Sequence, residues 1–397
     1  MKKIIYIILI VFILCSCNKK EKLPIKEEHA NNILPLIIKE DLKFEYASDL
    51  YLYDLFDKRD STIISENIKL DTLKLGTYTT NVEYIENNNK ISKDITYSIV
   101  DSTKPLVLIN STLTVEKGAK NIVNKVLCAD NYDKRPKCTI EGNYNANKVG
   151  TYDNLTYKAI DSSGNSVSYN FKLKVVNPSK SSSSNKEKYK IEDLIKNHKK
   201  ENTMIGIDVS SWQNTVDYKK VKNSGVEFVM IRIGFGHNKK GELVIDKQFK
   251  NNIKNAKAAG LKVGLYFYSY ANTNDKAKEQ VKWIVKNLNG EKLDLPIAFD
   301  WEDWKSFNSY NMSLYDIKEV ARIFINECKN NGYDAMLYSS KYYLEEIWGI
   351  DNFDTWLAHY TSKEKSSYKG NYMMWQLSSR GKVPGISGDV DLDILYK

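Results

Sequence analysis

The spacing of apolar and polar residues divides the chain into four stretches. An unbroken apolar run covers residues 4–14, close to the N-terminus. From about residue 34 to residue 177, short segments alternate apolar and polar positions, which is typical of β-strands with one buried face. Residues 178–202 are polar and rich in Ser and Lys, and from residue 203 strand-like runs alternate with helical patterns. We therefore expect β domains, a flexible linker and a C-terminal α/β domain.

The β-rich stretch contains an internal repeat. The segment DLFDKR at residues 54–59 returns as DNYDKR at residues 130–135. The segment GTY at residues 76–78 returns at residues 150–152. Matching segments in the same order and at nearly the same offset indicate two copies of one small domain.

Both copies are expected to be antiparallel β-sandwiches, because their strands are short and separated by polar turns. We assign them to residues 34–103 and 104–177. The second copy resembles the immunoglobulin-like modules of bacterial surfaces, and the first is a more divergent match. This resemblance implies a spacer or an adhesive arm. Asp130 and Asp133 are expected to lie in a solvated turn, since few oxygen atoms converge there to bind calcium.

The C-terminal stretch predicts a small β/α barrel. Its eight strand-like segments cover residues 204–209, 228–233, 262–270, 295–301, 335–339, 355–360, 372–377 and 390–395. Helical patterns cover residues 216–223, 246–259, 275–287 and 314–331. The last three strands leave no room for helices between them. A doubly wound sheet would show the same alternation, but no Gly-rich phosphate loop follows the first strand.

Four carboxylates lie on or directly after three of these strands. Asp300 and Glu302 share one face of their strand, where two neighbouring carboxylates repel and one pKa rises enough for a general acid. Asp208 ends the first strand, and Asp391 lies on the last. Barrel enzymes build their sites at the C-terminal ends of strands, so we expect all four to face one cleft. The alternative is that some are ordinary solvated strand ends.

The N-terminal apolar run is expected to be a targeting segment. Two Lys residues precede it, and its length suits a signal peptide better than a transmembrane helix. It ends in LCSC at residues 14–17, which resembles the lipobox of bacterial lipoproteins. We expect a signal peptide at residues 1–16, a lipid on Cys17, a tether at residues 17–33, and export to the outer face of the bacterial cell membrane. An ordinary signal peptide that contains cysteines is the alternative.

The composition excludes several further classes of function. The chain has 397 residues, a formal net charge of +9, five Cys and four scattered His. The charge is spread along the chain, so we expect no nucleic-acid partner, and the His spacing matches no metal site. We expect no metal, no cofactor and a monomer. Cys128 and Cys138 are candidates for one disulfide in an exported protein, provided that their Cα atoms lie within about 7 Å.

The C-terminal motifs resemble those of glycoside hydrolase family 25 lysozymes. They are GIDVSSWQ at residues 206–213, FDWE at 299–302, WLAHY at 356–360, WQ at 375–376 and VDL at 390–392. The resemblance covers residues 203–397 and implies a flattened barrel of five β/α units followed by three strands. It also implies a muramidase that cuts the β-1,4 bond from N-acetylmuramic acid to N-acetylglucosamine in peptidoglycan glycan strands. One departure is the segment at Arg232, where many members carry Lys-x-Ser/Thr-Glu-Gly.

The resemblance also implies roles for individual residues. Glu302 would be the general acid, and Asp300, Asp208 and Asp391 would surround the reacting sugar, whose acetamide group would assist. All seven Trp follow Met204, and aromatic rings stack on the apolar faces of sugars. Substrate contacts are expected from Tyr268, Tyr338, Trp356, Trp375, Gln376 and Arg232.

Two other functions stay open at this point. One is a chitinase-like hydrolase of N-acetylhexosamine polymers, which also ends a strand in Asp-x-Glu; its longer acidic signature is replaced here by Leu-Pro-Ile at residues 295–297. The other is a non-catalytic lipoprotein whose barrel only binds cell-wall glycan.

Overall fold

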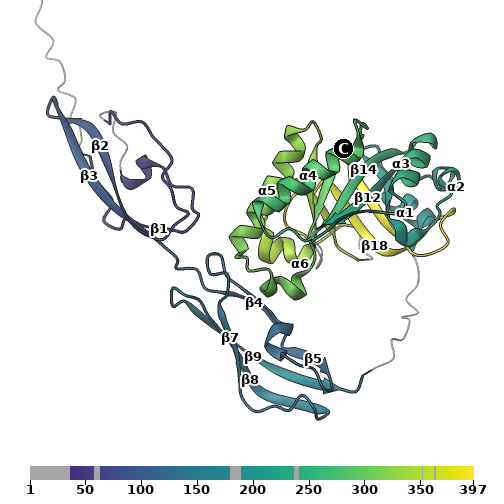
Figure 1. Ribbon diagram of the computed structural model, residues 1–397, viewed down its shortest axis with the longest axis horizontal. Helices are drawn as coiled ribbons and strands as arrows, with labels where there is room; N and C mark the ends of the chain where they lie inside the picture. Colours follow the sequence, from purple (N-terminus) through teal and green to yellow (C-terminus); the bar gives the residue numbers. More distant parts are fainter. Residues whose placement is uncertain (1–35, 58–62, 179–188, 237–240, 351, 362–363) are drawn as a thin grey trace, which may run out of the picture. The chain divides into compact units, whose positions relative to one another are not determined.

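The computed structural model describes residues 36–57, 63–178, 189–236, 241–350, 352–361 and 364–397 (Figure 1). The predicted signal peptide, Cys17, the tether and the Ser-rich part of the linker lie outside these residues. In the described part, no helix combines the length and the apolar character that crossing a membrane requires. The chain divides into two compact units, and most of the second unit is formed by residues 99–397.

The first repeat is built around one long hairpin. Strands β1 (Lys43–Glu45), β2 (Gly76–Glu86) and β3 (Asn89–Val100) form a sheet in the order β1-β3-β2, and η1 (Leu52–Leu55) is a 3-10 turn. Asn87 and Asn88 join β2 to β3 with φ angles of 50° and 62°, the left-handed conformation that tight hairpins require. The described residues form one sheet here, whereas the sequence predicts the two sheets of a sandwich.

The second repeat has two sheets. They are β4 (Leu106–Leu108) with β6 (Leu127–Ala129), and a sheet in the order β5-β9-β8-β7 made of β5 (Thr112–Glu116), β9 (Ser166–Val176), β8 (Gly150–Ile160) and β7 (Lys137–Glu141). A 3-10 turn, η2 (Ile122–Lys125), precedes β6. A disulfide joins Cys128 to Cys138, with Cα atoms 6.7 Å apart. The repeated GTY segment opens β2 and β8, which are both 11 residues long, so the sequence repeat marks equivalent hairpins.

The C-terminal domain is a closed barrel of eight strands. They are β11 (Thr203–Val209), β12 (Phe228–Gly236), β14 (Lys262–Ser269), β15 (Ile297–Asp300), β16 (Ala335–Ser340), β17 (Thr355–Ala358), β18 (Met374–Lys382) and β19 (Val390–Tyr396). The first seven run parallel, and β19 pairs antiparallel with both β11 and β18, which closes the ring. Two short strands extend the sheet: β10 (Tyr189–Lys190) beside β18, and β13 (Leu243–Ile245) beside β12.

Helices follow the early strands only. They are α2 (Tyr218–Asn223), α3 (Phe249–Ala258), α4 (Asn274–Leu288) and α5 (Leu314–Asn330), and the short α6 (Lys341–Tyr343) runs into a π-helical turn, η5 (Leu344–Trp348), after β16. Two 3-10 turns also follow strands: η3 (Ser211–Gln213) after β11 and η4 (Trp304–Ser309) after β15. No helix lies between β17, β18 and β19 in the described residues. The helical segments begin within about three residues of the predicted ones.

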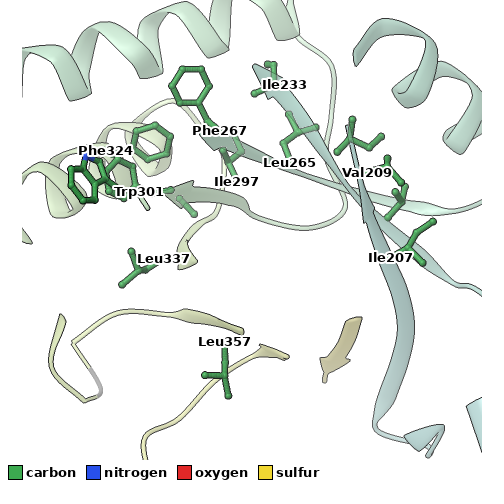
Figure 2. Close-up of a cluster of buried hydrophobic side chains, with 14 of the residues drawn as sticks. Ile207, Val209, Ile233, Leu265, Phe267, Ile297, Trp301, Phe324, Leu337 and Leu357 are labelled. Carbon is green, nitrogen blue, oxygen red and sulfur yellow. The ribbon is translucent and has the colours of Figure 1, made fainter. Parts of the chain in front are cut away.

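Alternation along the strands separates two layers of side chains. In β11 to β18, odd-numbered positions such as Ile207, Leu265 and Leu337 face the helices, where Phe324 of α5 joins them (Figure 2), whereas in β19 the even-numbered Leu392 and Ile394 do so. Even-numbered positions such as Met230, Ala298 and Met336 fill the barrel interior. Gly206 leaves space for this filling, because a Cβ there would lie 2.2 Å from the ring of Phe228. The polar residues at the strand ends continue the inward-facing rows.

The barrel domain begins earlier in the chain than the sequence suggests. The sequence places residues 189–198 in the linker and indicates one short helix at residues 191–198; that helix is confirmed as α1 (Ile191–His198), but α1 packs on the barrel, and β10 pairs with β18. Ile191 and Leu194, three residues apart on one face of α1, are both fully buried in the core that the helices share. Residues 189–202 therefore belong to the barrel domain.

Candidate active site

A pocket of about 250 Å³ opens at the C-terminal ends of the barrel strands. It is lined by Asp208, Arg232, Tyr266, Tyr268, Asp300, Glu302, Tyr338, Trp356, Tyr360, Gln376 and Asp391. Strand register explains the grouping: Tyr268, Asp300, Tyr338 and Trp356 are directly paired across β14, β15, β16 and β17. Asp208 of β11 is paired with Asp391 of β19 in the same way. The structure thus brings the four predicted carboxylates into one pocket.

The pair at the end of β15 combines a buried and an accessible carboxyl group. Asp300 is 4% exposed, and its Oδ1 has no hydrogen-bond partner among the described residues. Burial and the charge of Glu302 raise the pKa of Asp300 well above its usual value, which the charge of Arg232 partly offsets. Glu302 is reachable from solvent, yet desolvation by the pocket walls still raises the pKa of its carboxyl group. The charge repulsion expected from the sequence therefore raises the pKa of Asp300, whereas removal from water raises the pKa of Glu302.

Asp208 is held by a chain of hydrogen bonds across the pocket floor. Gln376 Nε2 donates to Asp208 Oδ2 at 2.7 Å. The hydroxyl groups of Tyr338 and Tyr360 both donate to Gln376 Oε1, at 2.9 and 2.8 Å. These two donors fix the orientation of the Gln376 amide, so its N–H group points at the carboxylate. Two tyrosines thereby position Asp208 through Gln376.

A fifth carboxyl group lies beneath the pocket. Asp393 is fully buried, and its Oδ1 accepts a hydrogen bond of 2.9 Å from Trp356 Nε1. Burial raises the pKa of Asp208, and the charges of Asp391 and Asp393 raise it further. Burial also raises the pKa of Asp391 to about 6, with a contribution from the charge of Glu302. The site therefore gathers carboxyl groups whose burial and mutual repulsion favour the protonated form.

Arg232 lies on the pocket wall, held by a buried acid. Its Nη2 is 2.7 Å from Asp246 Oδ2 and 3.2 Å from Ser211 Oγ, and its Nε donates to the same carboxylate oxygen at 2.9 Å. The Asp246 side chain is completely buried. Backbone N–H groups of Ser211 and Gln248 also donate to Asp246. A guanidinium so fixed presents its charge to the pocket in one orientation.

The prediction that Trp375 contacts the substrate is wrong. Its side chain is fully buried among the helix-facing residues, and its Nε1 donates to the carbonyl of His359 at 2.9 Å. Its ring meets His198 of α1 edge-on, with centroids 5.7 Å apart. Neighbouring residues on a strand point to opposite sides, so Trp375 faces outward because Gln376 faces the pocket. The other five predicted contact residues all line the pocket.

Four residues of the site escaped the sequence analysis. Tyr266 and Tyr360 line the pocket, while Asp246 and Asp393 support it from below. Period-2 alternation was a usable signal for two of them, because Tyr266 shares a strand face with Tyr268, and Asp393 with Asp391. Asp246 carried no such signal, since it follows the short strand β13 in a loop.

Comparisons with known proteins point to one family for this domain. Residues 207–386 match the model of glycosyl hydrolases family 25. The chain is 33% identical over 192 residues to the autolytic lysozyme of Clostridium acetobutylicum, which covers 48% of this chain and 55% of that protein. It is 29% identical over 198 residues to lysozyme M1 of Streptomyces globisporus, covering 47% of this chain and 65% of that one.

Solved structures include similar chains. The crystal structure of the bacterial lysozyme from Streptomyces coelicolor is similar with a TM-score of 0.40 and 25% identity, over 48% of this chain and 90% of that chain. The chain spans little more than half the length of the C. acetobutylicum relative. Together, the family model and the curated relatives support a family 25 lysozyme domain in the C-terminal half of the chain.

Proposed function

We propose that this chain is a lysozyme that cleaves the β-1,4 bond between N-acetylmuramic acid and N-acetylglucosamine in peptidoglycan. The family 25 match and the lysozyme relatives support the proposal. The observation that carries it is the pair at the end of β15, where Glu302 is accessible and has a raised pKa beside the buried Asp300. A glycosidase needs a carboxyl group that keeps its proton and reaches the leaving oxygen.

In this proposal Glu302 protonates the glycosidic oxygen as the bond to C1 breaks. The acetamide oxygen of the substrate attacks C1 and forms an oxazolinium ion, and Asp300 orients that acetamide group. Water then opens the ion, with the Glu302 carboxylate accepting its proton, so the product keeps its anomeric configuration. Asp208 and Asp391 stabilise the positive charge that develops on the sugar. Tyr268 supplies aromatic surface to the sugar rings.

The test compares Glu302→Gln with the wild-type chain on purified peptidoglycan. Loss of the general acid should lower the rate by at least about 10²-fold. Glu201→Gln is the matched control, because Glu201 is exposed in the turn before β11 and should leave the rate unchanged. A Glu302→Gln variant that cleaves at nearly the wild-type rate would refute the assignment. Products with inverted configuration by NMR would eliminate the acetamide route and leave Glu302 in place.

Product analysis separates the proposal from its two alternatives. Mass spectrometry of the digest should find muramic acid at the new reducing ends. Cleavage of chitin with little activity on peptidoglycan would favour the chitinase-like function. Glycan binding without any cleavage would favour a wall-binding lipoprotein.

The proposal includes attachment to the outer face of the cell membrane through a lipid on Cys17. Two acyl chains hold a protein on a bilayer, whereas one holds it weakly. The LCSC segment supports this part of the proposal. A Cys17→Ala chain expressed in a bacterial host should leave the membrane fraction; equal membrane retention of the variant would rule the anchor out.

A further inference from the structure

Three aspartates meet at one end of the second β domain. Asp101 follows β3, Asp130 follows β6 and Asp161 follows β8, so they come from three separate loops. Only 7%, 1% and 7% of their respective surfaces are exposed. One carboxylate oxygen of each lies within 4.8 Å of the corresponding oxygens of the other two. The expected solvated turn at Asp130 is therefore wrong, because the fold covers this side chain.

The hydrogen bonds around this cluster leave two oxygens without donors. Asp130 Oδ1 accepts from the backbone N–H groups of Tyr132 and Asp133, at 2.9 and 2.7 Å. Asp130 Oδ2 is buried and has no partner among the described residues. Asp101 Oδ2 accepts from Ser163 Oγ at 2.9 Å, while Asp101 Oδ1 is likewise buried and unpartnered in the described part.

The third aspartate offers these oxygens no donor. Asp161 Oδ1 accepts from the backbone N–H groups of Ser163 and Asn165, and Asp161 Oδ2 accepts from Asn165 Nδ2 at 2.9 Å. No Lys or Arg of the described residues forms an ion pair with any of the three carboxylates. Like charges buried together without a counter-ion are costly, so a cation or a proton must offset them.

We propose that Asp101, Asp130 and Asp161 bind one Ca²⁺ ion. Ca²⁺ takes six to eight oxygen ligands at about 2.4 Å, so two ligands on opposite sides of the ion lie about 4.8 Å apart. Oxygens already within 4.8 Å of one another therefore fit around one ion. Mg²⁺, with ligands at about 2.1 Å, requires a tighter set. Water completes the rest of the shell.

The ion would tie together three segments of the chain, one before and two within the second β domain. These are the segment leading into β4, the turn after β6 and the β8–β9 turn. A ligand that binds the folded state alone stabilises it, so calcium should raise the unfolding temperature of this domain. The inference is independent of the proposed glycosidase, because its residues lie outside the pocket.

The test uses the full chain after EDTA treatment and dialysis. Calorimetric titration with CaCl₂ should find one ion per chain, with a dissociation constant of about 10⁻⁴–10⁻³ M as in extracellular calcium modules. At 10 mM CaCl₂, one calorimetric unfolding transition should rise by at least about 5 °C. Trp fluorescence should follow the unfolding of the barrel, because every Trp follows residue 204. MgCl₂ should raise the unfolding temperature of the second β domain less than CaCl₂ does.

Variants locate the ion. Asp101→Asn and Asp130→Asn should each weaken binding at least about tenfold. Asp153→Asn is the matched control, since Asp153 is a surface partner of Lys172 in the same domain and should bind calcium like the wild type. Should the Asn variants fail to fold, Tb³⁺ in place of Ca²⁺ on the wild-type chain gives a second readout. A site beside Tyr132 predicts a tyrosine contribution to the Tb³⁺ excitation spectrum, and a spectrum without that contribution would overturn the location.

Three further results would overturn the proposal. One is a wild-type chain with neither binding heat nor a temperature shift at 10 mM CaCl₂, as expected if a shared proton offsets the charge. The second is full binding by both folded Asn variants. The third is an equal shift with MgCl₂, which would remove the assignment to Ca²⁺.

Discussion

Helix α1 should contribute a large share of the stability of the barrel, although it lies in a stretch with the composition of a linker. Ile191 and Leu194 are fully buried in the same core as the barrel strands and their covering helices. The perturbation is the double substitution Ile191→Ala and Leu194→Ala in the full chain. It keeps the helix propensity of α1 and removes only the buried side-chain atoms.

The size of the effect follows from burial. Truncating a buried Ile or Leu to Ala costs about 2–5 kcal/mol through lost burial and the cavity left behind. The two sites are neighbours on one helix face and share their surroundings, so their effects add incompletely. We expect a loss of about 3–6 kcal/mol in the free energy of unfolding, a large part of the 5–15 kcal/mol typical of a domain.

Urea unfolding followed by Trp fluorescence is a suitable assay, because all seven Trp lie after residue 204, in the barrel domain. With a dependence of about 2 kcal/mol per molar urea, the midpoint should fall by at least about 1 M. Lys196→Ala is the control, since Lys196 is exposed on the same helix and should change the stability by less than about 0.5 kcal/mol.

One result would refute this reasoning. If the double variant and the control unfold at the same urea concentration, α1 is not part of the cooperative unit of the barrel. A catalytic segment starting at Thr203, which the sequence alone suggests as sufficient, would then be as stable as one starting before Tyr189. Under our interpretation the segment from Thr203 should be markedly less stable.

Three other outcomes are expected. Burial and the charge of Asp391 raise the pKa of Asp393 in the folded state, so the folded protein loses stability as the pH rises from about 4 through that pKa. The Asp393→Asn variant lacks this loss, so its urea midpoint should exceed that of the wild type by more at pH 8 than at pH 4. Tyr338→Phe removes one hydrogen-bond donor to Gln376 and should lower the hydrolysis rate about 2- to 10-fold with little change in KM. An unchanged rate would mean that Tyr360 alone orients the Gln376 amide. Reducing the Cys128–Cys138 bond should destabilise the second β domain by about 2–3 kcal/mol, while the unfolding seen by Trp fluorescence stays in place.

The barrel was largely predictable because each of its strands carries a buried apolar run. The predicted segment 262–270 became β14 at Lys262–Ser269, and the segment 335–339 became β16 at Ala335–Ser340. Alternation along those runs also predicted which carboxylates meet, because the apolar positions of one face pack against the helices and the positions between them face the barrel interior. The same rule, applied to the last strands, would have turned Trp375 outward and added Asp393.

The remaining differences depend on contacts between distant residues. Nothing local distinguishes Ile191 and Leu194 from apolar residues of a solvated helix, because the surface that buries them is formed by other strands. Asp130 was expected in solvent for the same reason: Asp101 and Asp161 reach it only in the folded domain. The first repeat contains the long hairpin that the repeated segments mark, but no local pattern in the sequence indicates whether a second sheet forms.

The charge distribution of the pocket explains why its residues are costly to the fold and useful to the proposed reaction. Arg232 is the one cation among the described residues that line the pocket, against the carboxyl groups of Asp208, Asp300, Glu302 and Asp391. Burying that much negative charge destabilises the folded protein, and the raised pKa of Asp391, about 6, reflects this. A sugar that becomes positively charged in the transition state removes part of this repulsion, whereas the neutral bound sugar does not. Such a pocket therefore favours the transition state over the ground state, which is the condition for catalysis.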